Sequence, residues 1–200
     1  TLETVRLALT LGFTSVMFDG SHFPLEENIE KTKEIVALAE KFGASVEGEI
    51  GSIGGAEGDM ASADIQVTSV SEAKRFAAET KVDALAVAIG TAHGNYKETP
   101  HLRIDRLQEI HEALDTPLVL HGGTGLTAAD FHNCLVNGIT KINIATASYD
   151  RSAAKIKEVH QAKPEANYFD FSEAISVGTY ENVKKHMEIF GLKGKAGLYN

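Results

Sequence analysis

The sequence predicts an α/β fold in which single buried strands alternate with helices. Three apolar runs of strand length carry this prediction: Ala84–Ile89, Pro117–His121 and Lys141–Ala145. A helical pattern follows each run, and this alternation is typical of parallel sheets that are covered by helices. Glycine or polar residues end each run. Because ligands bind at the carboxyl ends of parallel strands, the sequence predicts a site at that rim of the sheet.

The N-terminal half begins with a helix rather than a strand. Its predicted elements are a helix over Thr1–Leu11, a strand over Ser15–Asp19, a helix over Leu25–Phe42, a strand over Ala44–Ile50 and a loop over Gly51–Thr68. Apolar residues recur at helical spacing in both helices, which Gly12 and Gly43 end. In the second strand, Glu47 and Glu49 share one face, because strand side chains repeat every second residue. A loop of this length in a compact domain is usually functional or mobile.

The C-terminal half continues the alternation. Its predicted elements are a helix over Ser71–Thr80, a strand over Ala84–Ile89, a helix over Arg103–Leu114, a strand over Pro117–His121, a helix over Ala128–Asn137, a strand over Lys141–Ala145, and helices over Ser148–Val159 and Glu173–Phe190. Five β/α units without a doubly wound fingerprint indicate a TIM (β/α)8 barrel. Since that barrel needs eight strands and about 250 residues, we interpret residues 1–200 as a single domain that supplies the last five units.

Composition limits the classes of function. The 200 residues are 43% hydrophobic with a net charge of −9, so neither nucleic acid nor an anionic membrane is expected as a partner. A phosphorylated substrate remains compatible, because backbone amides and a metal bind phosphate locally. Cys134 is the only cysteine, which excludes an internal disulfide and favours a reducing, cytoplasmic compartment. No apolar run approaches the roughly 20 residues of a membrane span.

Two histidines stand at or just beyond predicted strand ends, and glycine follows each of them. They are His93 and His121, and Asn143 lies in the third apolar run. Neutral imidazole is a common zinc ligand, and groups that converge from separate strands predict a metal site with a substrate clamp. Either histidine alone would equally suit a capped or core position. The pair with its glycines favours the metal site.

Six motifs in this order are similar to those of the class II, zinc-dependent ketose-bisphosphate aldolases, which include fructose- and tagatose-bisphosphate aldolases. They are Asp19-Gly20-Ser21-His22, Glu47-Gly48-Glu49-Ile50-Gly51, Gly54-Gly55-Ala56-Glu57, Gly90-Thr91-Ala92-His93-Gly94, His121-Gly122-Gly123-Thr124-Gly125 and Asn143-Ile144-Ala145-Thr146. The resemblance implies a lyase of carbohydrate metabolism, such as glycolysis. It would cleave a ketose 1,6-bisphosphate reversibly to dihydroxyacetone phosphate and glyceraldehyde 3-phosphate through a metal-stabilised enediolate. It also implies a homo-oligomer, either a dimer or a tetramer.

The resemblance assigns metal-binding roles to four positions. His93 and His121 would be two of three histidines that bind Zn²⁺, which leaves a coordination position for substrate. Asp19 and Glu49 would form the outer shell of the metal or an alternative metal position, where carboxylates commonly orient ligating histidines. The remaining zinc histidine and an acid belong to a His-x-Asp-His element that the family places before the first helix. We therefore expect the working polypeptide to extend beyond Thr1 at its N terminus.

The resemblance also assigns the chemistry and the phosphate contacts. Glu57 would be the loop acid that moves the proton at the dihydroxyacetone carbon, and Asn143 would hydrogen-bond the enediolate. After Thr146 the sequence departs from the usual acidic, leucine and basic residues, which leaves Arg151 as the candidate for the distal phosphate. A monovalent cation, Na⁺ or K⁺, is expected near the first phosphate. The expected phosphate- and substrate-binding residues are Gly94, Gly122, Gly123, Thr124, Ile144, Ala145 and Thr146.

Other functions stay open at this point. A non-catalytic barrel fragment that binds sugar phosphate or only packs against a partner would fit the absent element, and it would need no stoichiometric zinc. A metal-free barrel that binds flavin or phosphate would fit the glycines but leave His93 and His121 unexplained. Among aldolases, the sequence does not separate fructose from tagatose bisphosphate. A phosphorylated deoxy-keto sugar acid is a further candidate substrate.

Overall fold

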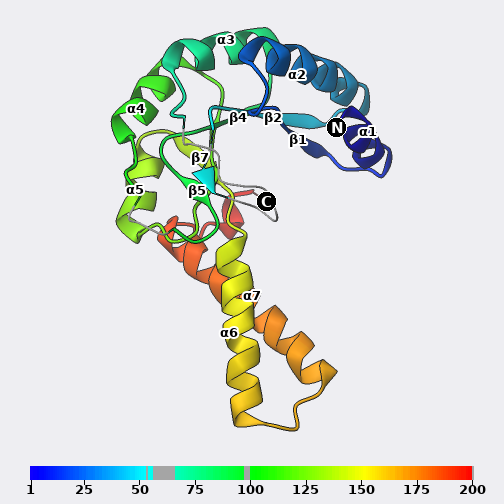
Figure 1. Ribbon diagram of the computed structural model, residues 1–200, viewed down its shortest axis with the longest axis vertical. Coiled ribbons are helices and arrows are strands. Elements are labelled where there is room, and N and C mark those ends of the chain that lie inside the picture. Colours follow the sequence, from blue (N-terminus) through cyan, green and yellow to red (C-terminus); the bar gives the residue numbers. More distant parts are fainter. Residues whose placement is uncertain (53, 56–65, 97–99, 200) are drawn as a thin grey trace. The chain divides into compact units, whose positions relative to one another are not determined.

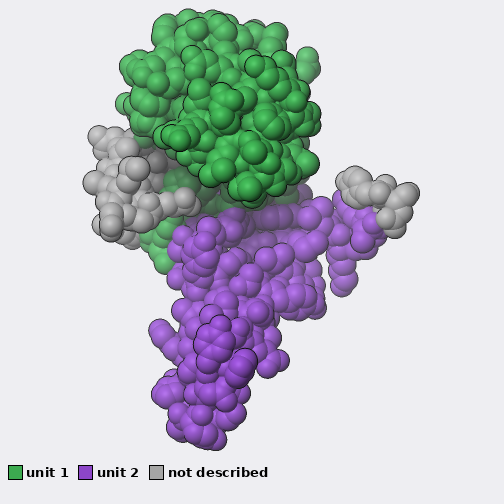
Figure 2. Space-filling view, turned by 90° about the vertical axis from the view of Figure 1, so that its right-hand side faces the viewer, with its two compact units in different colours: residues 1–123, 133–143 green, residues 124–132, 144–200 purple. Residues whose placement is uncertain are grey.

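The computed structural model describes residues 1–52, 54–55, 66–96 and 100–199. The chain forms two compact units, which Figure 2 colours separately. Unit 1 comprises residues 1–123 and 133–143, and unit 2 comprises residues 124–132 and 144–200. The single domain over residues 1–200 stays a prediction.

Unit 1 is built on a five-stranded parallel sheet with the strand order β1-β2-β4-β6-β7. Its strands are β1 (Ser15–Asp19), β2 (Ser45–Ile50), β4 (Ala84–Val87), β6 (Leu118–Leu120) and β7 (Ile139–Ile142). Every neighbouring pair is parallel. A parallel pair requires a crossover, and here each crossover carries a helix. The predicted α/β class, with β/α units of a (β/α)8 barrel, is therefore confirmed.

Helices cover the outer face of this sheet, and α2, α3 and α4 form an arc outside the strands in Figure 1. Large apolar side chains on these helices are fully buried, and each contributes about 1.5–3 kcal/mol by leaving water; they include Ile29, Ile35, Phe76, Leu107 and Ile110. The helices that precede or connect the strands are α1 (Leu2–Thr10), α2 (Leu25–Ala39), α3 (Val70–Thr80), α4 (Ile104–Ala113) and α5 (Ala128–Val136).

Strand β2 separates an apolar outer face from a polar inner face. Phe76 of α3 packs on Gly48, where an added Cβ atom would lie 2.8 Å from the aromatic ring. Glu47 and Glu49 flank Gly48, so both point to the opposite face. They are only 5% and 3% exposed. Because carboxylates are rarely buried without partners, the inner face must provide polar or charged neighbours for them.

Unit 2 contains two long helices that pack side by side, α6 (Thr146–Ala162) and α7 (Tyr168–Ile189). Gly178 permits their close approach, because a Cβ atom there would lie 2.7 Å from the Cα atom of Ser152. Asn167 caps α7 by accepting hydrogen bonds from two backbone N–H groups, and the Asp170 carboxylate accepts one from the Asn167 N–H. Among the described residues, no helix is both long and apolar enough to cross a membrane.

Several predicted boundaries are corrected. The strand predicted over Lys141–Ala145 is β7, which begins and ends earlier because Ile139 pairs with Leu118 of β6. The helix predicted from Glu173 begins at Tyr168, where the Asn167 cap starts it. Other differences are a 3-10 turn over Glu40–Phe42 and another over Ala196–Tyr199, the start of α6 at Thr146, and a two-stranded parallel ladder of β3 (Gly54–Gly55) and β5 (Ala92–His93).

Candidate active site

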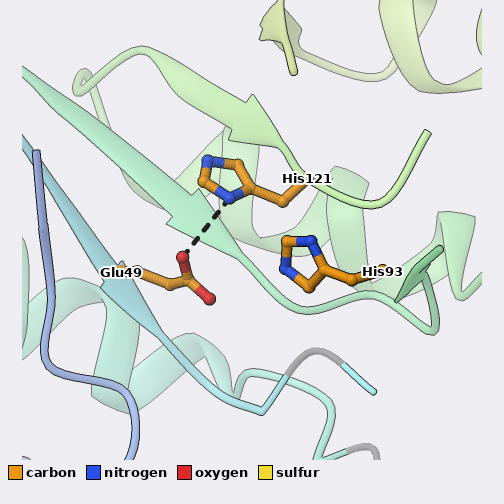
Figure 3. A group of neighbouring side chains, drawn as sticks. All are labelled: Glu49, His93 and His121. Carbon is orange, nitrogen blue, oxygen red and sulfur yellow. Dashed lines mark ion pairs between the residues drawn. The ribbon is translucent and has the colours of Figure 1, made fainter. Parts of the chain in front are cut away.

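Three side chains converge on the inner face of unit 1 (Figure 3). Glu49, His93 and His121 each offer one ligand atom, and these atoms all lie within 4.8 Å of one another. The His121 Nδ1 atom is 3.4 Å from the Glu49 Oε2 atom, and the two imidazole rings meet edge to face with centroids 6.0 Å apart. Two histidines and a glutamate are a donor set of catalytic zinc sites with three protein ligands. The group therefore fits a divalent transition metal such as zinc.

The ends of two strands of the sheet and one short strand outside it position this group. Glu49 is the penultimate residue of β2, His121 follows β6 directly, and His93 lies in β5. The buried Asn28 side chain on α2 donates to the Glu49 backbone carbonyl at 2.8 Å. A Cβ atom at Gly20 would come within 2.1 Å of the Asn28 side-chain oxygen, so glycine is required at that position. Helix α2 thus fixes the end of β2 and, with it, the Glu49 carboxylate.

A second set of polar groups surrounds the buried His121 ring. The Glu47 Oε1 atom lies 2.8 Å from His121 Nε2, and the Asn143 Nδ2 atom lies 3.0 Å from the same nitrogen. Lys141 Nζ donates to the other Glu47 oxygen at 2.5 Å. The Lys141 side chain is 52% exposed whereas that of Glu47 is 7% exposed, so the ammonium group reaches a buried carboxylate from the solvent side.

These contacts determine the protonation state of the Glu47 carboxyl group. Burial raises the pKa of the Glu47 carboxyl, but the hydrogen bonds with His121 and Lys141 and the Lys141 charge lower it, and the net pKa is below its ordinary value. Glu47 is therefore ionised at neutral pH. As a carboxylate, it only accepts hydrogen bonds.

Tyr96 connects the two segments that carry the histidines. Its hydroxyl donates to the Gly122 backbone carbonyl at 2.7 Å and accepts from the Ala92 N–H at 3.1 Å. Ala92 precedes His93 and Gly122 follows His121. One phenolic oxygen thus ties together the backbone on either side of the proposed metal group.

We expect Tyr96→Phe to destabilise unit 1 by about 1–3 kcal/mol, because the Ala92 N–H and the Gly122 carbonyl lose a partly buried partner. Urea unfolding, with Tyr180→Phe at a 64% exposed tyrosine as the control, measures this change. Equal unfolding free energies for the two variants would contradict the role given to the Tyr96 hydroxyl.

The other residues predicted for metal or proton chemistry are not members of this group, although Asp19 of β1 pairs with Glu49 of β2, or they fall outside the described residues. Asp19 Oδ1 accepts hydrogen bonds from the backbone N–H and the hydroxyl of Ser21, at 3.0 and 2.6 Å. It is exposed and does not belong to the three-residue group. Glu57 falls outside the described residues. Its role and that of Asp19 stay predictions.

The residues predicted for phosphate binding fall in both units. In unit 1, Gly94, Gly122 and Gly123 follow the two histidines. In unit 2, the Thr124 hydroxyl accepts from the Ala147 N–H at 3.2 Å. The unit also contains the predicted residues Ile144, Ala145 and Thr146, of which Thr146 begins α6. Their joint role in phosphate binding stays a prediction.

Arg151 has acidic neighbours within unit 2. Its guanidinium contacts Glu158 at 2.7 Å and Glu181 at 2.5 Å, and Lys155 bonds the same two carboxylates. The contacts with Glu181 join α6 to α7. A distal phosphate would have to compete with two carboxylates for Arg151, whose role in substrate binding stays a prediction.

Sequence reasoning missed Glu47, Lys141 and Tyr96 as parts of the site. The strand period offered a signal for two of them: Glu47 lies two residues before Glu49, and Lys141 lies two residues before Asn143. Glu47 therefore faces the same side of its strand as Glu49, and Lys141 the same side as Asn143. Tyr96 follows a short strand of two residues and has no such signal.

Parallel β/α units with polar groups at the carboxyl ends of their strands define a protein of the (β/α)8-barrel class. A family model described as "Fructose-bisphosphate aldolase class-II" matches residues 1–195. The chain therefore belongs to the class II fructose-bisphosphate aldolase family.

Individual relatives agree with this family. The chain is 42% identical over 197 residues to the sulfofructosephosphate aldolase of Alkalicoccus urumqiensis, which covers 96% of this chain and 68% of the relative. It is 46% identical over 145 residues to the 6-phospho-5-dehydro-2-deoxy-D-gluconate aldolase of Shouchella clausii (strain KSM-K16). This match covers 72% of this chain and 49% of the relative. The crystal structure of the YdjI aldolase from Escherichia coli K12 superposes with a TM-score of 0.82 at 31% identity. The superposition covers 98% of this chain and 67% of the YdjI chain. The chain thus spans from 49% to 68% of the length of these relatives.

Proposed function

We propose that this chain forms part of a zinc-dependent aldolase that cleaves a ketose 1,6-bisphosphate, fructose or tagatose, to dihydroxyacetone phosphate and glyceraldehyde 3-phosphate. The observation that carries the proposal is the group of Glu49, His93 and His121, whose ligand atoms lie within 4.8 Å of one another. It stands at the carboxyl ends of parallel strands, where enzymes of the barrel class have their active sites. Family membership over residues 1–195 supports the same reaction class.

Each residue has a distinct task in this proposal. Zinc, when bound by His93 and His121, would supply a Lewis acid for the substrate carbonyl and hydroxyl oxygens. Glu49 would complete the ligand set or orient it. Asn143 would donate its amide N–H to the enediolate oxygen, which carries negative charge as the carbon–carbon bond breaks. Glu57 would return a proton to the dihydroxyacetone carbon as a general acid.

Phosphate would bind to backbone N–H groups beside the two histidines. The positive backbone dihedral angles of Gly94 and Gly122, with φ of +81° and +71°, are of the kind that turns successive amides toward an anion. The family resemblance also implies phosphate contacts for Thr124 and residues 144–146. A monovalent cation, Na⁺ or K⁺, would offset the phosphate charge. A cytoplasmic dimer or tetramer is proposed from the family resemblance and the single cysteine.

The substrates named for the relatives differ at the end of the sugar that is distal to the dihydroxyacetone phosphate half. Their names describe one phosphorylated sugar with a sulfo group and one with a carboxylate. These names favour a second candidate function for this chain, in which an aldolase accepts a sugar monophosphate with a sulfonate or carboxylate at the distal end. The dihydroxyacetone phosphate half would then bind in the same way in both cases.

The test is a cleavage assay on the complete polypeptide with fructose and tagatose 1,6-bisphosphate, a sulfofructose phosphate and 6-phospho-5-dehydro-2-deoxygluconate. Glycerol-3-phosphate dehydrogenase and NADH report the dihydroxyacetone phosphate that forms. We expect one substrate to dominate kcat/KM, a chelator to abolish turnover, and added zinc to restore it. A product trapped covalently by borohydride would refute the mechanism, and zinc well below one equivalent would favour a binding or structural protein.

A further inference from the structure

We propose that Glu47, paired with Lys141, is a positioning residue that keeps the His121 ring proton on Nε2 and so presents Nδ1 to Glu49 and His93. The inference rests on the metal site of the proposed function and adds two residues to it. Neither has a role in the reaction proposed above. Both would act through His121 rather than on the substrate.

The tautomer follows from the chemistry of the contact. The Glu47 Oε1 atom lies 2.8 Å from His121 Nε2, and a carboxylate has no proton to donate. Nε2 must therefore carry the hydrogen of this bond. An imidazole must be neutral to bind a metal and then has one N–H, so Nδ1 is the nitrogen left with a lone pair. Nδ1 is also the ring nitrogen nearer the three-residue group, at 3.4 Å from Glu49 Oε2.

Lys141 makes this arrangement rigid. It donates to the Glu47 oxygen that His121 does not use, so both oxygens of the carboxylate are engaged. Glu47 comes from β2, Lys141 from β7, and His121 follows β6. Because β4 and β6 lie between β2 and β7 in the sheet, the Glu47–Lys141 bond spans the curved inner face. A carboxylate held from both sides cannot rotate away from the imidazole.

The tautomer also frees a donor for the substrate. Asn143 Nδ2 lies 3.0 Å from His121 Nε2, but a nitrogen that donates to Glu47 has no lone pair to accept a second hydrogen bond. The Asn143 N–H group is therefore available to another acceptor, such as the enediolate oxygen of a bound substrate. Glu47 thus affects both the ligand nitrogen of His121 and the proposed donor to the enediolate.

Glu47→Gln separates this role from simple packing, because the two side chains have nearly the same shape. An amide has one acceptor oxygen, for which Lys141 and the His121 N–H compete. When Lys141 takes the oxygen, the amide N–H faces Nε2, and the ring proton moves to Nδ1. We expect zinc affinity, measured by chelator competition on the complete polypeptide, to fall roughly 10–100-fold, as it does for other outer-shell partners of metal ligands.

Removal of the competitor should reverse the effect. In Glu47→Gln combined with Lys141→Met, the amide oxygen is available to the His121 N–H again. We expect the double variant to bind zinc several-fold more tightly than Glu47→Gln, and Lys141→Met alone to bind zinc more weakly than the wild type, because Glu47 is then held by His121 only. Independent, additive losses from the two substitutions would overturn the role of Lys141.

The ring tautomer provides a readout that does not require metal. In the metal-free protein, two-bond ¹H–¹⁵N correlations of the His121 ring should report a proton on Nε2 in the wild type and a shift toward Nδ1 in Glu47→Gln. A wild-type ring protonated on Nδ1, or an unchanged zinc affinity in Glu47→Gln, overturns the inference. A wild type with the Nε2 tautomer but no zinc binding would refute the proposed function while the tautomer assignment stands, so the two failures are distinguishable.

Discussion

Replacement of His93 by alanine is expected to weaken zinc binding by more than about 100-fold. Disturbing an outer-shell partner of a metal ligand already costs roughly 10–100-fold, and the loss of a ligand removes a metal bond altogether. In the structure, His93 shares the metal group only with Glu49 and His121, so no third histidine of the described chain is placed to substitute for it. Chelator competition with the complete polypeptide measures the loss.

The matched control is His132→Ala. His132 is an exposed residue of α5, so its removal lowers the histidine content by the same amount without touching the metal group. We expect wild-type affinity for this variant. The absorption spectrum of the cobalt-substituted protein adds a second measurement, because loss of an imidazole changes the ligand field. Zinc affinity within a few-fold of wild type in His93→Ala would exclude this group as the metal site.

The ends of the strands were the most predictable part of the site. His121 stands where an apolar run stops, and the structure indeed places it directly after β6. The resemblance marks Glu49 through its motif, and the strand period puts it on the same face as Glu47. The positions of these residues at strand ends are predictable because a short buried strand is readable from local sequence. The side that its residues face then follows from the period of two.

Other parts of the site depend on contacts that local sequence does not encode. Glu47 and Lys141 are 94 positions apart and come from strands that are not neighbours in the sheet. Only the curvature of the inner face brings them together. Likewise, the strand predicted to precede His93 ends at Val87, and His93 itself lies in β5, a separate short strand paired with β3. A strand of two residues has no periodicity to detect.

The buried polar network also shows why unit 1 tolerates charge in its interior. Glu47 is balanced by Lys141, whose own side chain remains 52% exposed, so only one of the two charges loses most of its hydration. A pair that is half in water avoids much of the desolvation penalty of a fully buried pair. The ionised Glu47 carboxylate beside His121 therefore has a counter-ion that stays partly in water.

The second large effect is expected for Gly122→Ala, which should destabilise unit 1 by about 3 kcal/mol or more. Gly122 has φ of +71°, and a Cβ atom there would lie 2.5 Å from the Ala92 carbonyl oxygen and 2.8 Å from the Ala92 carbonyl carbon. Both atoms are backbone, so the clash is relieved only if one segment moves. Movement would separate the residues that flank His121 and His93, and zinc affinity should fall together with stability.

Gly43→Ala isolates the contribution of the clash. Gly43 has a similar φ of +65°, but nothing lies within 4 Å of the position of its Cβ atom. This variant therefore carries only the cost of a left-handed alanine, about 1–2 kcal/mol, and leaves the metal group untouched. The difference between the two unfolding free energies in urea measures the collision with Ala92. Equal destabilisation with unchanged zinc affinity would mean that the two histidine-bearing segments move apart freely, and that the close approach at Gly122 does not hold the site together.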